Sequence, residues 1–488
     1  MNDSTTTARF GCTLSARSIP LPHVWEHLVG SDHAPMALRA DWRAQLRRCR
    51  EELGFRYVRF HGLLSDDMST LIRVQGTPTC SFFNADQIFD FLLSIGMKPF
   101  VELSFMPGAL ASGATTVFHY RGNVTPPRDY DEWSALIHAL ASHVVDRYGI
   151  EEVSQWYFEV WNEPNLRPFW TGDQEKYFRL YRHAAMAIKA VHPRLRVGGP
   201  ATAANAWIDD FLEFCSVNQL PVDFVSTHHY PNDDCGDEGD APDVQLSRGQ
   251  RSALREQARA TRRQAGSKPV FYTEWNTSAN PRDPLHDEPY AAAFIVKTVL
   301  EASALVDSYG FWTFSDIFEE DGFSSRPFHG GFGLLNIHGI AKPSYRAFEV
   351  LHRLGTEMLR VTGTHQTVDA WVIRDANEIA IVLTNHALPH HPIDTEQVHA
   401  TLNDAVNPDS AAIERIDARH TNAKAVWQQM GEPEYPDAAA LAMLHDASRL
   451  RSERQSWRYH DGTIALDVAL PPHAVAVVTF RFATHDRD

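Results

Sequence analysis

The 488-residue sequence lacks features that mark several large classes of protein. No apolar window approaches the roughly 20 residues that a membrane-spanning helix needs, so we expect no membrane partner. Five cysteines are scattered without CxxC spacing, which argues against a disulfide framework or a zinc site and favours reduced thiols in a cytoplasmic protein. The N-terminus has no basic segment followed by an apolar core, so no secretory signal is expected.

Basic residues are also few relative to acidic ones, which gives a formal net charge of −17. Because phosphate binding requires clustered lysine and arginine, we expect neither nucleic acid nor an anionic surface as a partner. The hydrophobic share of 43% and the charged share of 22% are typical of a soluble globular protein. The length exceeds that of one ordinary domain and suffices for a sizeable core.

Short apolar runs alternate with amphipathic stretches over about the first 350 residues. The runs predict eight strands, at 24–30, 56–62, 98–106, 157–163, 196–200, 222–230, 269–276 and 309–316. Helical spacing predicts helices between them, at 41–53, 85–95, 131–148, 173–192, 206–218 and 248–265. Eight such units predict an α/β fold, a (β/α)₈ TIM barrel. An open doubly wound sheet is the alternative, but no GxGxxG follows the first strand.

The residue pattern changes from about Thr356. Four runs, VDAWVIRD, EIAIVLTN, GTIALDVAL and HAVAVVTFRF, alternate with period two. This pattern predicts antiparallel strands with one face buried, hence a C-terminal β-sandwich with a short helical insertion near 437–450. We therefore divide the chain into a barrel at 15–350 and an accessory sandwich at 351–488. Residues 1–14 are candidates to join the sandwich.

Two glutamates occupy matching positions in this scheme. Glu163 ends the fourth predicted strand in VWNEP, and Glu274 ends the seventh in FYTEWN. Functional residues of such barrels gather at the carboxyl ends of the strands, so both carboxylates are expected over one mouth. A single glutamate in an apolar run is often a structural ion-pair partner. Two at corresponding positions favour glycoside hydrolysis, in which one protonates the departing oxygen and the other attacks the anomeric carbon or activates water.

Six segments spread over the predicted strands carry a family resemblance. They are VRFHGLLSDDM (58–68), FHYRGNVTPPRDY (118–130), VWNEPN (160–165), STHHYP (226–231), YTEWN (272–276) and FWTFSDIFEE (311–320). Together they resemble family 39 of the retaining (β/α)₈ glycoside hydrolases, which contains β-xylosidases and α-L-iduronidases. The resemblance implies that Glu163 is the general acid/base and Glu274 the nucleophile, with the carboxylates about 5–5.5 Å apart. It implies no cofactor and no metal ion.

Strand parity and the resemblance assign further binding residues. In STHHYP, His228 and Tyr230 share one face of the strand while His229 points away. The family pattern has a tyrosine beside the nucleophile here, so His228 and Tyr230 are expected to face the site. A core histidine satisfied by hydrogen bonds is the alternative for His228. Adjacent histidines on a strand cannot readily chelate one ion, so the pair His228 and His229 argues against a metal site.

Three more positions follow from the other motifs. In VRFHG, Arg59 and His61 share a face, and either a barrel ion pair or a role in the site suits Arg59. By the resemblance, Asn162 donates to the sugar 2-hydroxyl; a capping side chain is the alternative.

The last strand and two loops supply the remaining candidates. By the resemblance, Trp312 forms the floor under the sugar, with a purely core tryptophan as the alternative. Glu320, favoured over Glu319, accepts from sugar hydroxyls unless both are solvated loop charges, and Phe118 lines the leaving-group side.

The leading hypothesis is a retaining β-D-xylosidase that removes the non-reducing-end xylose from xylo-oligosaccharides. The alternatives are an α-L-iduronidase-like or α-L-arabinosidase activity and, more remotely, a non-catalytic carbohydrate-binding barrel. An iduronidase must bind a carboxylate, and only Arg59 and Lys342 are nearby basic candidates. The acidic, glycine-containing segment 233–243 is predicted to be an exposed loop; a calcium site is the weaker alternative, because the EF-hand ligand spacing is absent. The sandwich could serve a subunit interface in a homo-oligomer.

Overall fold

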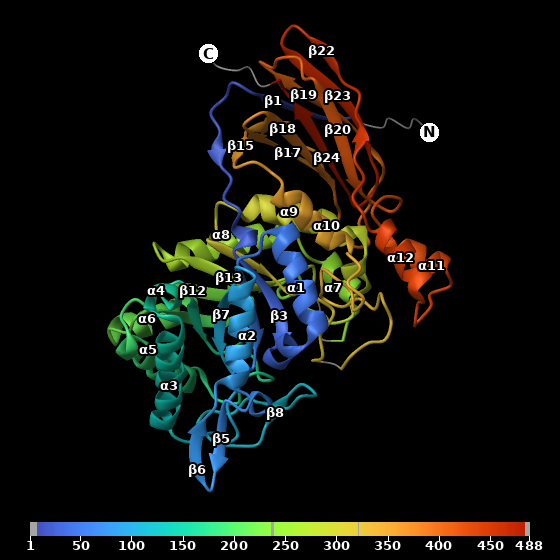
Figure 1. Ribbon diagram of the computed structural model, residues 1–488. Coiled ribbons are helices and arrows are strands. Elements are labelled where there is room, and N and C mark those ends of the chain that lie inside the picture. The colour runs from blue at the N-terminus through green and yellow to red at the C-terminus, as the bar shows by residue number, and fades with distance from the viewer. Residues whose placement is uncertain (1–6, 236–238, 321, 484–488) are drawn as a thin grey trace.

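A closed barrel of eight parallel strands and a two-sheet β-sandwich make up the described part of the chain in the computed structural model, residues 7–235, 239–320 and 322–483 (Figure 1). The predicted fold class is thus confirmed. The predicted acidic loop falls partly on residues 236–238, outside the described residues. The domain boundaries stay a prediction. Strand β1 (Ala8–Thr13) lies in the sandwich, and β2 (Ile19–Pro20) pairs with one of its sheets.

The barrel strands follow one another in chain order around the barrel, and the last pairs with the first. They are β3 (Leu28–His33), β4 (Tyr57–His61), β7 (Lys98–Leu103), β10 (Tyr157–Val160), β11 (Arg196–Thr202), β12 (Phe224–His228), β13 (Val270–Trp275) and β14 (Ser308–Phe311). The helices outside them are α1 (Ala40–Leu53), α2 (Phe83–Ser94), α3 (Tyr130–Tyr148), α4 (Ile150–Val153), α5 (Gln174–Val191), α6 (Ile208–Val217), α7 (Pro242–Ser247), α8 (Ala253–Ala265), α9 (Pro289–Ala302) and α10 (Pro343–His352). Two hairpins, β5 (Leu71–Val74) with β6 (Thr77–Cys80) and β8 (Thr116–Val117) with β9 (Gly122–Asn123), extend its loops.

Local signals explain where several helices begin and end. The Asp129 side chain accepts from the Asp131 N–H at the start of α3, and the Asp173 side chain accepts from the Lys176 N–H at the start of α5. Helix α1 ends at Gly54, whose φ of 76° lies in the left-handed region that glycine adopts readily.

Helices α9 and α10 are absent from the sequence prediction. Nearly every residue of α9 is buried, because the helix lies between the barrel and the sandwich (Figure 1). A helix that is apolar all round shows no polar stripe, so amphipathic periodicity cannot detect it.

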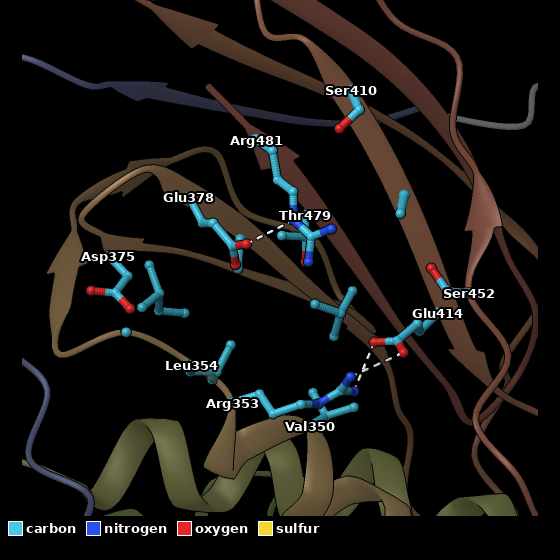
Figure 2. A pocket seen from close by; sticks show the side chains of 15 residues that line it. Val350, Arg353, Leu354, Asp375, Glu378, Ser410, Glu414, Ser452, Thr479 and Arg481 are labelled. Atoms are coloured by element: carbon cyan, nitrogen blue, oxygen red, sulfur yellow. Dashed lines mark hydrogen bonds and ion pairs between the residues drawn. The ribbon is translucent and has the colours of Figure 1, made fainter. Parts of the chain in front are cut away.

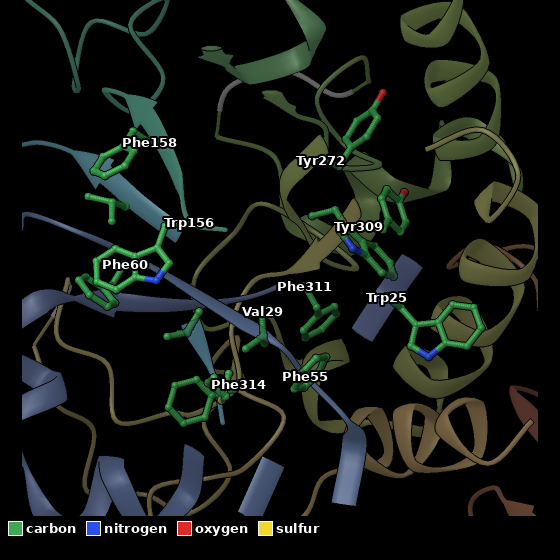
Figure 3. Packing of buried hydrophobic residues seen from close by; sticks show 14 of the residues in the cluster. Trp25, Val29, Phe55, Phe60, Trp156, Phe158, Tyr272, Tyr309, Phe311 and Phe314 are labelled. Atoms are coloured by element: carbon green, nitrogen blue, oxygen red, sulfur yellow. The ribbon is translucent and has the colours of Figure 1, made fainter. Parts of the chain in front are cut away.

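Apolar side chains fill the space between the strands and the surrounding helices. Figure 3 shows part of this cluster, to which the barrel strands contribute Phe60, Phe158 and Phe311. Inside the barrel, a second small cluster joins Leu28, Phe100, Phe224 and Phe271 from strands on different sides. Charged and polar side chains lie above this aromatic layer, toward the carboxyl ends of the strands.

The sandwich consists of a five-stranded and a seven-stranded sheet. The first contains, in order, β16 (Val361–Thr362), β1, β19 (Glu396–Asn403), β23 (Thr463–Leu470) and β22 (Arg458–His460). The second contains β2, β15 (Glu357–Leu359), β17 (Val368–Asp375), β18 (Glu378–Asn385), β24 (Ala474–Arg481), β20 (Ser410–Ile416) and β21 (Glu453–Arg454). The helix expected near 437–450 is α12 (Ala438–Ala447), and α11 (Ala423–Gln429) is a further helix that was not predicted.

The expectation of one buried face is wrong for the strands nearest the barrel. In β24, Val478 packs into the sandwich core, whereas Val475 and Val477 belong to the core that continues into the barrel. Both faces of the seven-stranded sheet are therefore covered there, one by the partner sheet and the other by α9 and α10.

Candidate active site

Arg59 lies fully buried in β4 and contacts four acceptors above the aromatic layer. Its Nε donates to Glu159 Oε2 at 2.6 Å and its Nη1 to Glu274 Oε1 at 2.6 Å. Its Nη2 lies 2.8 Å from Glu102 Oε2 and donates to Asn162 Oδ1 at 2.9 Å. The planar, permanently charged guanidinium offers five donors, so one side chain can hold three carboxylates. Arg59 is thus at once a barrel ion-pair centre and a direct contact of the site.

Glu274 is held on both sides of its carboxylate. Arg59 contacts Oε1, and the Tyr230 hydroxyl donates to Oε2 at 2.9 Å. Burial raises the pKa of Tyr230 well above its ordinary value, so the hydroxyl stays a donor. These two contacts fix the orientation of the carboxylate at the barrel mouth.

Glu163 lies beyond the end of β10 in a different environment. The strand stops at Val160 rather than at Glu163, because Trp161 (φ 72°) and Glu163 (φ 43°) adopt left-handed backbone. Burial raises the pKa of Glu163 to about 7, against the opposing effect of the His61 and Arg59 charges. Its Oε1 lies 2.9 Å from His228 Nδ1, while Oε2 has no hydrogen-bond partner among the described residues.

The two glutamates approach each other closely. One oxygen of each carboxylate and a ring nitrogen of His228 lie within 4.8 Å of one another. The same three groups could hold a metal ion, as could Asp32, His33 and Glu319 nearby. In the first group, however, both Glu274 oxygens already accept hydrogen bonds from Arg59 and Tyr230.

A pocket of about 280 Å³ opens above these carboxylates. Eight of the nine predicted site residues line it: His61, Phe118, Asn162, Glu163, Tyr230, Glu274, Trp312 and Glu320. The ninth, His228, lies behind the wall against Glu163. Seven lining residues were not predicted: Leu166, Phe169, Ala203, Asp233, Ala279, Pro281 and Phe332. They follow the strand ends on loops with no periodicity.

His61 and Trp312 form one side of the pocket. His61 Nδ1 lies 2.7 Å from Glu102 Oε2, and its Nε2 lies 3.6 Å from Glu320 Oε1. Burial alone would lower the pKa of His61, but the Glu102 carboxylate raises it. The ring centroids of His61 and Trp312 are 4.8 Å apart. Asn276 donates to the backbone carbonyls of Trp312 and Phe332, which holds this wall.

Glu102 and Glu159 were missed as parts of this site. Both are glutamates inside apolar runs, FVELSFM and YFEVW, whereas Glu163 and Glu274 were singled out because they end their predicted strands. The signal that could have found them is a charged side chain inside an apolar strand, which is costly to bury without a partner.

Lys342, the second basic candidate of the sequence, is occupied elsewhere. Its Nζ is buried 2.7 Å from Asp287 and 2.7 Å from Asp316, and it donates to the Gly331 carbonyl at 2.8 Å. It holds the loop that carries Phe332 and does not line the pocket.

A second cavity, of about 390 Å³, lies between α10 and the sandwich (Figure 2). Four of its five charged side chains form two pairs, Arg353 with Glu414 and Arg481 with Glu378. The lining contains no aromatic side chain that could stack on a sugar ring. The barrel mouth, with its paired carboxylates, is therefore the candidate active site.

The profile described as "Glycosyl hydrolases family 39" matches residues 13–464. The chain belongs to this family. A β-xylosidase of Caldicellulosiruptor saccharolyticus is 51% identical over 463 residues, 94% of this chain and 95% of that protein. A β-xylosidase of Geobacillus stearothermophilus is 39% identical over 477 residues, 93% and 92% of the two chains. The crystal structure of a family 39 enzyme from Xanthomonas axonopodis pv. citri has a TM-score of 0.86 and 32% identity, covering 98% of both chains. This family 39 protein is a glycoside hydrolase, and the resemblance is confirmed.

Replacing Arg59 with Met should strongly destabilise this family 39 enzyme. Three buried carboxylates would lose their cation, and breaking a buried pair costs about 3–5 kcal/mol. Denaturant unfolding measures the loss. Arg39→Met is the control, because Arg39 pairs with Asp41 at the surface and should cost at most about 1 kcal/mol. Equal losses in the two variants would contradict the central role of Arg59.

Proposed function

We propose that this chain is a retaining β-D-xylosidase that releases xylose from the non-reducing end of xylo-oligosaccharides. The observation that carries the mechanism is the close approach of Glu163 and Glu274, with carboxylate oxygens within 4.8 Å. Retaining glycosidases have carboxyl groups about 5–5.5 Å apart, whereas inverting ones need about 6.5–9.5 Å to admit a water. The spacing favours double displacement.

In the first step Glu274 attacks the anomeric carbon while Glu163 gives its proton to the departing glycosidic oxygen. The glycosidic bond breaks, an ester forms between the sugar and Glu274, and the shortened oligosaccharide leaves as an alcohol. In the second step the Glu163 carboxylate takes a proton from water, and the resulting hydroxide displaces Glu274. Two inversions give net retention.

The environments of the two glutamates suit these roles. Glu274 contacts Arg59 and Tyr230, which orient it toward the pocket as an attacking group. Glu163 has its pKa raised to about 7 by burial, as an acid that must also act as a base requires. Asn162 Oδ1 accepts from Arg59, which leaves its NH₂ group as the donor for a sugar 2-hydroxyl.

Three observations support a neutral pentose as the substrate. Both curated relatives cited above are named β-xylosidases. Arg59 and Lys342, the basic residues that could pair with a uronic acid carboxylate, are both buried against carboxylates of the chain. No basic side chain other than histidine lines the described pocket. These features disfavour an α-L-iduronidase.

The cellular setting also belongs to this proposal. No helix among the described residues is long and apolar enough to cross a membrane. All five cysteines, which lie in described parts of the chain, are free thiols, as a reducing cytoplasm permits. We propose a cytoplasmic enzyme acting on small oligosaccharides. Assembly into a homo-oligomer stays a prediction.

A panel of nitrophenyl glycosides tests the substrate. We expect the β-D-xyloside to give the highest kcat/KM, since the pocket offers no cation for a uronate. Faster turnover of the α-L-iduronide or the α-L-arabinoside would overturn the specificity.

The pH dependence of kcat/KM tests the proton donor. As pH rises through about 7, Glu163 should lose the proton that it must donate, so activity on a poor leaving group should fall above that pH. The variant Glu163→Gln should lack this basic limb while still releasing dinitrophenol, which departs without a proton. A limb near pH 7 that persists in Glu163→Gln would exclude Glu163 as the acid.

A further inference from the structure

A chain of hydrogen bonds beneath the pocket links the Arg59 cation to Glu163. Arg59 Nε donates to Glu159 Oε2 at 2.6 Å, and the Thr273 hydroxyl donates to Glu159 Oε1 at 2.9 Å. Thr273 Oγ1 lies 3.0 Å from His228 Nε2, and His228 Nδ1 lies 2.9 Å from Glu163 Oε1. Glu159, Thr273 and His228 are completely buried, and none of them lines the pocket.

Donor and acceptor capacity fixes the direction of every bond in this chain. Glu159, paired with Arg59, is a carboxylate and can only accept. Thr273 has one hydroxyl proton, which it gives to Glu159, so its oxygen accepts from His228 Nε2. Burial lowers the pKa of His228 to about 4, so the ring is neutral and carries one proton, on Nε2. His228 Nδ1 is then an acceptor, and the contact with Glu163 Oε1 requires a protonated Glu163.

A β-bulge makes this arrangement available. Along β12 and β13 the pairing steps from Thr227–Tyr272 to His228–Glu274 and skips Thr273. The extra residue lets the neighbours Thr273 and Glu274 both contact groups inside the barrel, which regular strand alternation forbids. Thr273 therefore reaches Glu159 while Glu274 reaches Arg59.

We propose that Thr273 and Glu159 are positioning residues that fix His228 as its Nε2–H tautomer and thereby hold Glu163 protonated in the free enzyme. This inference rests on the proposed role of Glu163 as general acid. The Nδ1 lone pair accepts from the carboxylic acid and offers no donor to the carboxylate. Rotation of the carboxyl group about its terminal bond turns the proton from Nδ1 toward the substrate. After donation, the carboxylate lacks a donor from His228, which makes it a better base for the second step.

Thr273→Val removes the hydroxyl with little change of shape and is the test. Without its acceptor at Nε2, His228 can move its proton to Nδ1 and donate to the Glu163 carboxylate, which favours the ionised form. The basic limb of kcat/KM for a poor leaving group should move down by about one pH unit, a loss of about tenfold above the limb. The kcat/KM for dinitrophenol release from the activated xyloside reports only the first step and should change by less than about twofold, since this leaving group needs no proton. Thr273→Ser should restore the limb.

Thr227→Val is the matched control. Thr227 is also completely buried, on the adjacent strand, and its hydroxyl donates to the Thr202 carbonyl at 2.9 Å, outside the chain of bonds. In Thr227→Val the basic limb of kcat/KM for a poor leaving group should stay at the wild-type pH. An unmoved limb in Thr273→Val, or an equal loss on both substrates without a shift, would overturn the inference.

Two further measurements keep the test decisive. If Thr273→Val fails to fold, the ¹⁵N chemical shifts of His228 in the wild-type enzyme report the tautomer directly: a proton on Nε2 supports the inference, and a proton on Nδ1 overturns it. Glu163→Gln separates the two claims. If the basic limb persists in Glu163→Gln, the role of Glu163 as the acid is overturned. If the limb is lost in Glu163→Gln but keeps its wild-type position in Thr273→Val, only the positioning role is overturned.

Discussion

One buried guanidinium organises the catalytic end of this barrel. Arg59 contacts Glu102, Glu159 and Glu274, all of them almost completely buried. Charges of one sign cannot be buried together without a counter-charge, because desolvation and mutual repulsion both oppose it. The planar fork of arginine satisfies the three groups at once, and the remaining polar contacts of the site are built outward from it. Tyr230, His61, Thr273 and Asn162 each contact one of these four residues.

Glu163 and Glu274 have different electrostatic environments, because only Glu274 forms a hydrogen bond with the Arg59 cation. Glu274 accepts a hydrogen bond from the Arg59 cation. Glu163 instead contacts the ring of His228, which is neutral because burial lowers its pKa to about 4. Burial without a contacting cation raises the pKa of Glu163 to about 7. Environments that differ in this way let one carboxylate attack while the other donates a proton. The left-handed backbone at Trp161 and Glu163 turns the second carboxylate out of the strand and over the pocket.

Prediction from the sequence succeeded where a local residue pattern determines the structure. The strand–helix alternation predicted the barrel, and glutamates ending apolar runs selected Glu163 and Glu274, which both line the pocket at its mouth. Strand parity in STHHYP placed His228 and Tyr230 toward the site and His229 away from it. In the structure His228 contacts Glu163 and Tyr230 contacts Glu274, whereas His229 lies beside Asp234. It failed where tertiary contacts override the pattern. Helix α9 has no polar stripe because both sides are covered, and Glu274 faces inward beside its neighbour Thr273 only because of a bulge. Lys342, a candidate for binding a substrate carboxylate, is buried between two aspartates distant in sequence.

The central claim is that Glu274 attacks the sugar and Glu163 handles the proton, and stereochemistry tests it most directly. Hydrolysis of an activated β-xyloside by Glu274→Ala should be nearly abolished and should be restored by azide, which fits the space left by the carboxylate. The product should be the α-xylosyl azide, formed by a single inversion, and Glu163→Ala with azide should give the β-anomer. Unimpaired hydrolysis by Glu274→Ala, or the two anomers in reversed order, would contradict the account.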